Sequence, residues 1–184
     1  LYTGHRLRRV YYSAFSPIPD ASADLPLQAP PLIREHRLYQ ADWLMRFYGF
    51  AHEEIIAPGA AGMLDLEIDP KLAWALAHRQ HFPVNLNRAP EEWLLRVPGL
   101  GVRSVQRLLA ARCVRSLRLA DLQQLHVASA KVFAFVELAD YHPRPGALES
   151  PQLRAQLIAQ MAQGAVQRKH SGMHLAAAGQ MALF

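Results

Sequence analysis

The chain has 184 residues, of which 51% are hydrophobic, and it carries 20 Lys and Arg against 15 Asp and Glu, a net charge of +5. This length and composition suffice for a buried core in one domain with extensions, and the basic balance is compatible with a nucleic-acid partner. The single cysteine, Cys113, excludes an internal disulfide framework and a cysteine metal cluster, which indicates a reducing compartment, the cytoplasm. No apolar run approaches the roughly 20 residues needed to cross a membrane, and no signal peptide is evident.

The first segment with a regular pattern is RRVYYSAFSPI, residues 8–18, where β-branched and aromatic residues precede prolines. It predicts one strand, followed by a Pro- and Ala-rich loop over 20–32. A lone strand cannot pair with itself, so its sheet lies in missing sequence or is absent. Because the chain also begins at Leu1 rather than at a methionine, we expect a fragment.

Most of the remaining sequence predicts helices. Residues 32–50 have the spacing of an amphipathic helix that stops near Gly49, and Asp69-Pro70 begins another, with Asp69 as N-cap. Asn87 is predicted to cap a helix over about 89–97. The pattern predicts further helices over these ranges: 102–113, 119–125, 129–141 and 151–163. The last twenty residues are expected to be flexible, and Cys113 to be a small buried hydrophobe.

The stretch RVPGLGVRSVQRLL, residues 96–109, predicts a tight helical hairpin. Gly99 and Gly101 permit positive φ angles and close approach to the backbone, while Leu100 points into the core. The second helix then begins with free N–H groups at its positive dipole end, which suits a DNA phosphate. The predicted DNA-binding residues are Gly99, Leu100, Gly101, Val102, Arg103, Ser104 and Arg107.

Over about residues 86–113 this pattern resembles the helix-hairpin-helix family of sequence-independent DNA-binding modules; the alternative is an ordinary αα-hairpin with a glycine turn. LQQLHVASAKVFAFV, residues 122–136, reads as a degenerate second copy without the glycines, whose predicted role is packing. From Arg88 to Lys131 there are eight Lys and Arg against three acids, which favours a nucleic-acid face over a solvated basic surface.

The segments YYSAFSPIP, PLIREHRLYQADWLMRFYGF, LDLEIDPKLAWALAH and FPVNLNRAPEEWLLRVPGLGVRS occur in this order. Over about residues 8–140 the chain thereby resembles the C-terminal part of the DNA modification/repair radical SAM protein family. The resemblance implies an upstream partial barrel that holds a three-cysteine 4Fe-4S cluster and S-adenosylmethionine, then a helix-hairpin-helix region, and a partner similar to uracil-DNA glycosylase. Because this chain lacks the three cysteines, we expect it to hold no cofactor and to be inactive alone.

On this interpretation the fold is mainly α and contains a helix-hairpin-helix region. If the degenerate second copy is counted, the hairpins form a pair. An orphan late strand of a truncated radical SAM barrel precedes this region. The expected parts are a barrel remnant over 1–31, a helical connector over 32–86, the hairpin region over 87–141 and a flexible tail over 142–184.

The segment REHRLYQADW, residues 34–43, is dense in functional groups. Helical spacing places Glu35, Tyr39 and Asp42 on one side, with His36 and Gln40 nearby. They either face a substrate or cofactor at the open end of a barrel, or tie the helix to that barrel. No catalytic residue is assigned, and the histidines show no third ligand beside His78 and His81, so no metal site is predicted.

The chain ends in QMALF, where Gln180, Met181, Leu183 and Phe184 resemble the short peptide by which bacterial repair and polymerase proteins bind the sliding clamp; a chance match is the alternative. The predicted function is sequence-independent DNA binding. One rival is a protein interaction module, for the glycosylase-like partner or the clamp, with no direct DNA contact. Another is catalysis by an intact protein whose upstream sequence carries a Cys-x3-Cys-x2-Cys run.

Overall fold

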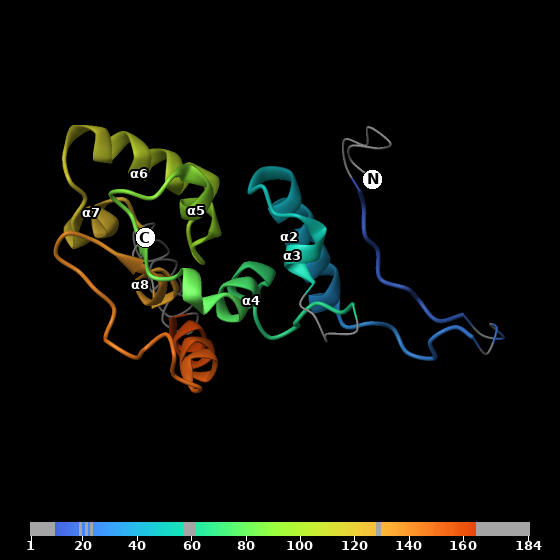
Figure 1. Ribbon diagram of the computed structural model, residues 1–184. Helices are drawn as coiled ribbons and strands as arrows, with labels where there is room; N and C mark the ends of the chain where they lie inside the picture. The colour runs from blue at the N-terminus through green and yellow to red at the C-terminus, as the bar shows by residue number, and fades with distance from the viewer. Residues whose placement is uncertain are drawn as a thin grey trace, which may run out of the picture. The chain divides into compact units, whose positions relative to one another are not determined.

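A computed structural model describes residues 10–18, 20, 22, 24–56, 62–127 and 130–164. Within these ranges the chain is mainly helical (Figure 1). It divides into two compact units, Leu1–Trp74 and Ala75–Phe184. This division falls at residue 74, whereas the sequence suggests boundaries at 31, 86 and 141.

Unit 1 is organised around α2 (Leu32–Phe47), followed by the short α3 (His52–Ile55). The long helix ends where the sequence predicts, because Gly49 adopts a φ of +70° that glycine accepts without strain. Ala41 and Leu44 are buried, and Phe50 packs edge-on against Trp74 with ring centroids 5.4 Å apart. The apolar face of α2 thus contributes to a small core.

The strand predicted over residues 8–18 is not formed in the described residues 10–18, which run as an extended segment (Figure 1). This segment is held at Tyr12 instead. Its N–H donates to the Tyr39 hydroxyl and its carbonyl accepts from that hydroxyl, both at 3.1 Å. A single extended segment has no strand edge to pair with, so a side chain of α2 satisfies its backbone.

The helix α4 (Pro70–Ala77) spans the boundary between the units and begins as the sequence predicts. The Asp69 side chain accepts a hydrogen bond from the Leu72 N–H at 2.9 Å, and Pro70 occupies the first helical position. This is an N-cap arrangement, which satisfies one of the donors that a helix leaves open at its start.

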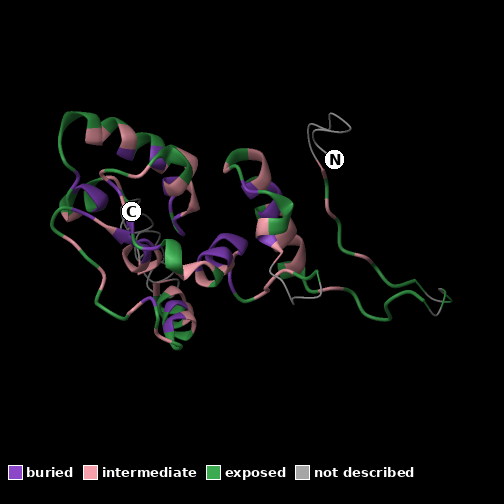
Figure 2. Cartoon of the chain, viewed as in Figure 1, coloured by how far each residue is buried: buried purple, intermediate pink, exposed green. Residues whose placement is uncertain are grey.

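In the described residues of unit 2, four labelled helices contribute side chains to one core. They are α5 (Glu91–Arg96), α6 (Val102–Val114), α7 (Leu119–Gln124) and α8 (Ala130–Phe135), with the 3-10 turn η1 (Arg79–His81) before them and a further helix over 153–164. Two-residue strands β1 (Val84–Asn85) and β2 (Val136–Glu137) pair in parallel. Buried residues come from every one of these four helices (purple in Figure 2). Phe135, Leu94, Leu108 and Leu122 are all fully buried.

Several predictions for unit 2 are wrong in detail. Asn87 does not cap α5, which follows Pro90; its side chain donates to the Leu117 carbonyl at 3.1 Å and accepts from the Leu117 N–H at 2.7 Å. The helix expected over 129–141 ends at Phe135, because the next two residues pair with β1. Cys113 is exposed rather than buried.

Candidate nucleic-acid interface

The glycine hairpin joins α5 to α6 through residues 97–101. Gly99 has a φ of +89°, a conformation that favours glycine, and Leu100 donates its N–H to the Val97 carbonyl at 3.2 Å. Val97 and Leu100 are almost completely buried, at 0% and 2% exposure. The loop is therefore fastened to the core by two apolar side chains, while Gly99 between them remains exposed.

The start of α6 presents backbone donors. Gly101 is its N-cap in an extended conformation, with φ −94° and ψ 166°, and supplies no capping side chain. The first N–H with a helical acceptor is that of Val105, which donates to the Gly101 carbonyl at 2.9 Å. The N–H groups of residues 102–104 precede it and have no intrahelical acceptor. Together with the helix dipole, they form an arrangement that favours an anion.

The predicted DNA-binding residues separate into two groups. Arg103 and Arg107 are exposed on the first two turns of α6, and Val102 and Ser104 are half-buried. Leu100, by contrast, faces the core and anchors the loop. The described geometry thus combines backbone donors, an exposed glycine and two guanidinium groups at one end of one helix.

Other basic residues of this region have structural partners. Arg112 donates to the carbonyls of Leu86 at 3.3 Å and Ala89 at 2.6 Å, which ties α6 to the segment before α5. Arg115 forms an ion pair with the buried Asp121. The sequence missed both roles, because each partner lies on another segment and leaves no local pattern.

Positive charge is concentrated in unit 2. It carries 13 Lys and Arg against 6 Asp and Glu, whereas unit 1 carries 7 against 9. Since the glycine hairpin belongs to unit 2, the basic part of the chain is also the part that presents the anion-favouring helix end.

The turn between α7 and α8 repeats a feature of the glycine hairpin. When Val127 is aligned with Leu100, His126 falls on Gly99, and His126 also has a positive φ, +53°. Val127 is buried, as Leu100 is. A positive φ is uncommon for a residue other than glycine, so the two turns share this backbone feature at one position, and a side chain stands at His126 where Gly99 has none. Without glycine as a signal, the sequence did not reveal this conformation.

Asp121 stabilises the start of the second hairpin. Its carboxylate accepts the Arg118 N–H at 2.8 Å and a guanidinium N–H of Arg115 at 3.1 Å. The hydrogen bond from the Arg118 backbone, helped by Arg115, lowers the pKa of this carboxyl below its ordinary value. The ionised form therefore stabilises the fold.

We expect the Asp121→Asn variant to be less stable than the original chain at about pH 7, by about 1.5–3 kcal/mol, because the hydrogen bonds to a charged group are weakened. Since the folded pKa is the lower one, this stabilisation is present above about pH 4 and is lost as the pH falls through the folded pKa. Thermal unfolding at several pH values checks this, with the exposed Glu149→Gln as control. A stability difference that stays constant down to about pH 3 would contradict it.

The residues predicted to face a substrate in unit 1 do not lie together. Tyr39 and Gln40 line a pocket between α2 and the start of α4, whereas Asp42 is buried and pairs with Arg46 at 3.5 Å. Glu35 is half-buried and His36 exposed, and neither lines that pocket. The Asp42 carboxylate thus pairs with a residue of its own helix, and the Tyr39 hydroxyl joins α2 to the backbone of Tyr12.

Two further predictions concern an iron-sulfur cluster and a sliding-clamp peptide. Cys113 is the only cysteine of the chain and lies exposed on α6, so the residues present do not fit a three-cysteine cluster. Among the described residues no group of three or more His, Cys, Asp and Glu is placed to hold a metal ion. Gln180, Met181, Leu183 and Phe184 lie outside the described ranges. No helix within those ranges is long and apolar enough to span a membrane.

No protein-family model, no curated protein and no solved structure matches this chain. A function must therefore be argued from the geometry and chemistry of its own residues. The start of α6 and the pocket of unit 1 are the two features that offer such an argument.

Proposed function

We propose that this chain binds DNA without sequence preference through the glycine hairpin of residues 97–104. The observation that carries the proposal is the start of α6, where backbone N–H groups without helical acceptors lie behind a glycine loop and beside two exposed arginines. Backbone and arginine donors of this kind bind phosphate oxygens, which are the same in every sequence. Binding through them is therefore independent of sequence.

The loop geometry supports a close phosphate contact. Neither Gly99 nor Gly101 has a Cβ, so a phosphate can approach the backbone directly. Val97 and Leu100 hold the loop on the core, so it needs little ordering when DNA binds. Arg103 and Arg107 add charge one helical turn apart. In this arrangement the hairpin acts as a helix-hairpin-helix module.

In the wider proposal, the chain is the C-terminal region of a DNA modification/repair radical SAM protein. Its support is the order of sequence segments over about residues 8–140. The cluster, S-adenosylmethionine and any chemistry then belong to sequence upstream, and a glycosylase-like protein is the proposed partner. The role of this chain is to hold DNA for that chemistry.

The test is fluorescence anisotropy of the full chain on labelled duplex and single-stranded DNA of two unrelated sequences, at salt concentrations from about 50 to about 200 mM. We expect the logarithm of the association constant to fall linearly with the logarithm of the salt concentration, equally for both sequences. Absent or salt-indifferent binding would overturn the proposal, and would favour the alternative of a protein interaction module.

A further inference from the structure

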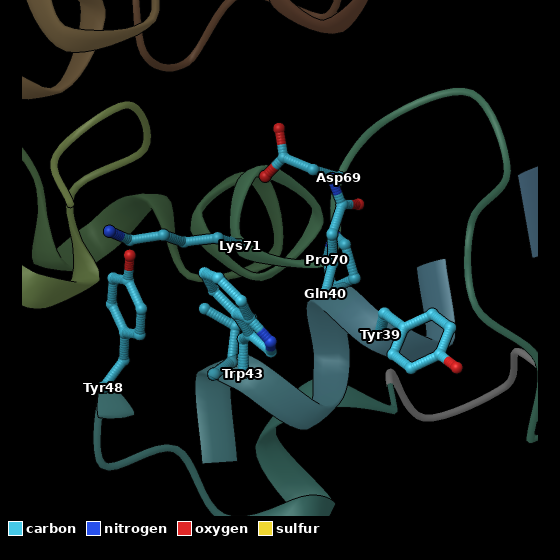
Figure 3. Close-up of a pocket in the computed structure, with 8 residues that line it drawn as sticks. Tyr39, Gln40, Trp43, Tyr48, Asp69, Pro70 and Lys71 are labelled. Carbon is cyan, nitrogen blue, oxygen red and sulfur yellow. The ribbon is translucent and has the colours of Figure 1, made fainter. Parts of the chain in front are cut away.

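Unit 1 contains a pocket of about 470 Å³ between the second half of α2 and the first turn of α4 (Figure 3). This volume is within the range of small-molecule sites. Side chains of α2, together with Tyr48, form one wall, and residues 69–71 form the other. All of the lining residues belong to Leu1–Trp74, so the pocket is formed within unit 1 alone.

The charges that line the pocket are balanced. They are the Asp69 carboxylate and the Lys71 ammonium, one of each sign. The carboxylate accepts the Leu72 N–H at 2.9 Å, and the ammonium lies 4.7 Å from the centroid of the Tyr48 ring. Both groups therefore have partners within the protein. Because a charged ligand would lose its hydration without meeting an uncompensated opposite charge, the pocket favours an uncharged ligand.

The walls offer flat aromatic surface. Trp43 is 58% exposed although it is the largest side chain in the lining, so its indole is accessible to a ligand. Phe47 contacts it in a T-shaped arrangement with ring centroids 5.9 Å apart, a geometry that covers no more than one face of the indole. Figure 3 shows Trp43 between Tyr48 and Tyr39 in this view. The pocket therefore suits a planar ring.

Gln40 supplies a hydrogen-bond donor whose orientation is fixed from outside the pocket. Its Oε1 accepts a guanidinium N–H of Arg37 at 2.8 Å, and Arg37 also donates to the Leu66 carbonyl at 3.1 Å. Because the amide oxygen is engaged in this way, the NH2 end of the amide is the end left for a ligand. Tyr39, by contrast, uses its hydroxyl on the backbone of Tyr12 and offers the pocket its ring. The lining thus selects an uncharged planar ring with a hydrogen-bond acceptor at its edge.

We infer that this pocket binds one unpaired nucleobase, stacked on Trp43 and accepting a hydrogen bond from the Gln40 amide, with no contact to a phosphate. The choice of a nucleobase among uncharged heterocycles rests on the proposed DNA-binding function, but the pocket uses none of the hairpin residues. Every base has a π-face and an acceptor at its edge, so this recognition tolerates any sequence. A base inside a duplex is covered by its stacked neighbours, whereas a free nucleoside and an unpaired base of a single strand present the same accessible ring.

The experiment measures binding of deoxyadenosine and thymidine to the full chain by isothermal titration calorimetry, with dAMP and N-acetylphenylalaninamide as comparison ligands. We expect deoxyadenosine and dAMP to bind within about threefold of each other, and both affinities to stay constant from about 50 to about 200 mM salt. Trp43→Leu weakens deoxyadenosine binding about tenfold, Trp43→Phe retains part of the affinity, and Gln40→Met weakens it about fivefold. Phe47→Leu is the matched control, because Phe47 is an exposed aromatic of α2 outside the pocket lining. Circular dichroism checks that each variant is folded.

The measurement is repeated in the Gly99→Val/Gly101→Val background, where nucleoside binding is expected to persist, so that failure of the hairpin and failure of the pocket are distinguishable. In that background, a short oligothymidylate that displaces deoxyadenosine identifies a single strand as the source of the base, and one that leaves it bound identifies a free nucleoside. Four results overturn the inference: no binding of either nucleoside, binding that Trp43→Leu leaves unchanged in folded protein, dAMP binding about tenfold tighter than deoxyadenosine, or N-acetylphenylalaninamide binding as tightly as a nucleoside. The last result would assign the pocket to an aromatic side chain of a protein partner.

Discussion

Replacing Gly99 and Gly101 by valine is expected to weaken DNA binding about tenfold or more and to flatten its salt dependence, while the chain stays folded. Two β-branched side chains would then stand between a phosphate and the N–H groups at the start of α6. Losing even one charge-assisted hydrogen bond accounts for a tenfold change. Anisotropy across salt measures the effect, and circular dichroism checks the fold.

The two glycines differ in how much backbone strain a valine at that position would introduce. Gly101 has a φ of −94° that any residue adopts, so Gly101→Val alone adds bulk without backbone strain. Gly99 has a φ of +89°, where valine is strained by about 1–3 kcal/mol. The matched control is Gly146→Val, because Gly146 has a φ of +73° with open space around it. A folded double variant with the original affinity and salt slope would show that the glycines only shape the turn.

The sequence predicted best where the signal is local. Asp69-Pro70 was expected to begin a helix, and the Asp69 carboxylate does accept the Leu72 N–H. Likewise, the two glycines marked a break between helices, and α6 begins at Val102 as predicted. Caps and turns depend on a few neighbouring residues, so their chemistry is readable from the sequence alone.

Long-range partners account for what the sequence did not reveal. Asn87 had the pattern of an N-cap, but its amide pairs with Leu117, 30 residues away. Val84 lies opposite Val136 in a strand pairing too short for a periodic pattern. The segment 8–18, expected to be a strand, has no neighbouring strand among the described residues and is held at Tyr12 by the Tyr39 hydroxyl instead. In each case a tertiary contact decides between conformations that local propensity leaves open.

The candidate site shows the same limit. Counting cations from Arg88 to Lys131 gives eight equivalent candidates, yet Arg112 and Arg115 are occupied by protein acceptors. For the pocket of unit 1, the sequence singled out Tyr39 and Gln40 but not Lys71. Lys71 lines the same pocket but lies on α4, about 30 residues later in the chain. Composition indicates the class of partner, and the fold determines which side chains are placed to meet it.

The exposed arginines of α6 provide the sharpest distinction between a phosphate site and a generally basic surface. We expect Arg103→Ala and Arg107→Ala each to reduce the salt slope of DNA binding by about 0.9, and together by about two, with equal loss of affinity for unrelated sequences. Anisotropy titrations of the single and double variants across salt measure these slopes.

Arg144→Ala is the control, because Arg144 is an exposed arginine of the same unit outside the hairpin and its loss changes the net charge equally. The salt slope counts the phosphates that protein cations neutralise, because each such contact releases counterions from the DNA. If Arg144 contacts no phosphate, Arg144→Ala leaves the slope unchanged. If all three single variants lower the slope alike, the charge acts as a diffuse field, and the start of α6 is not the place where DNA is held.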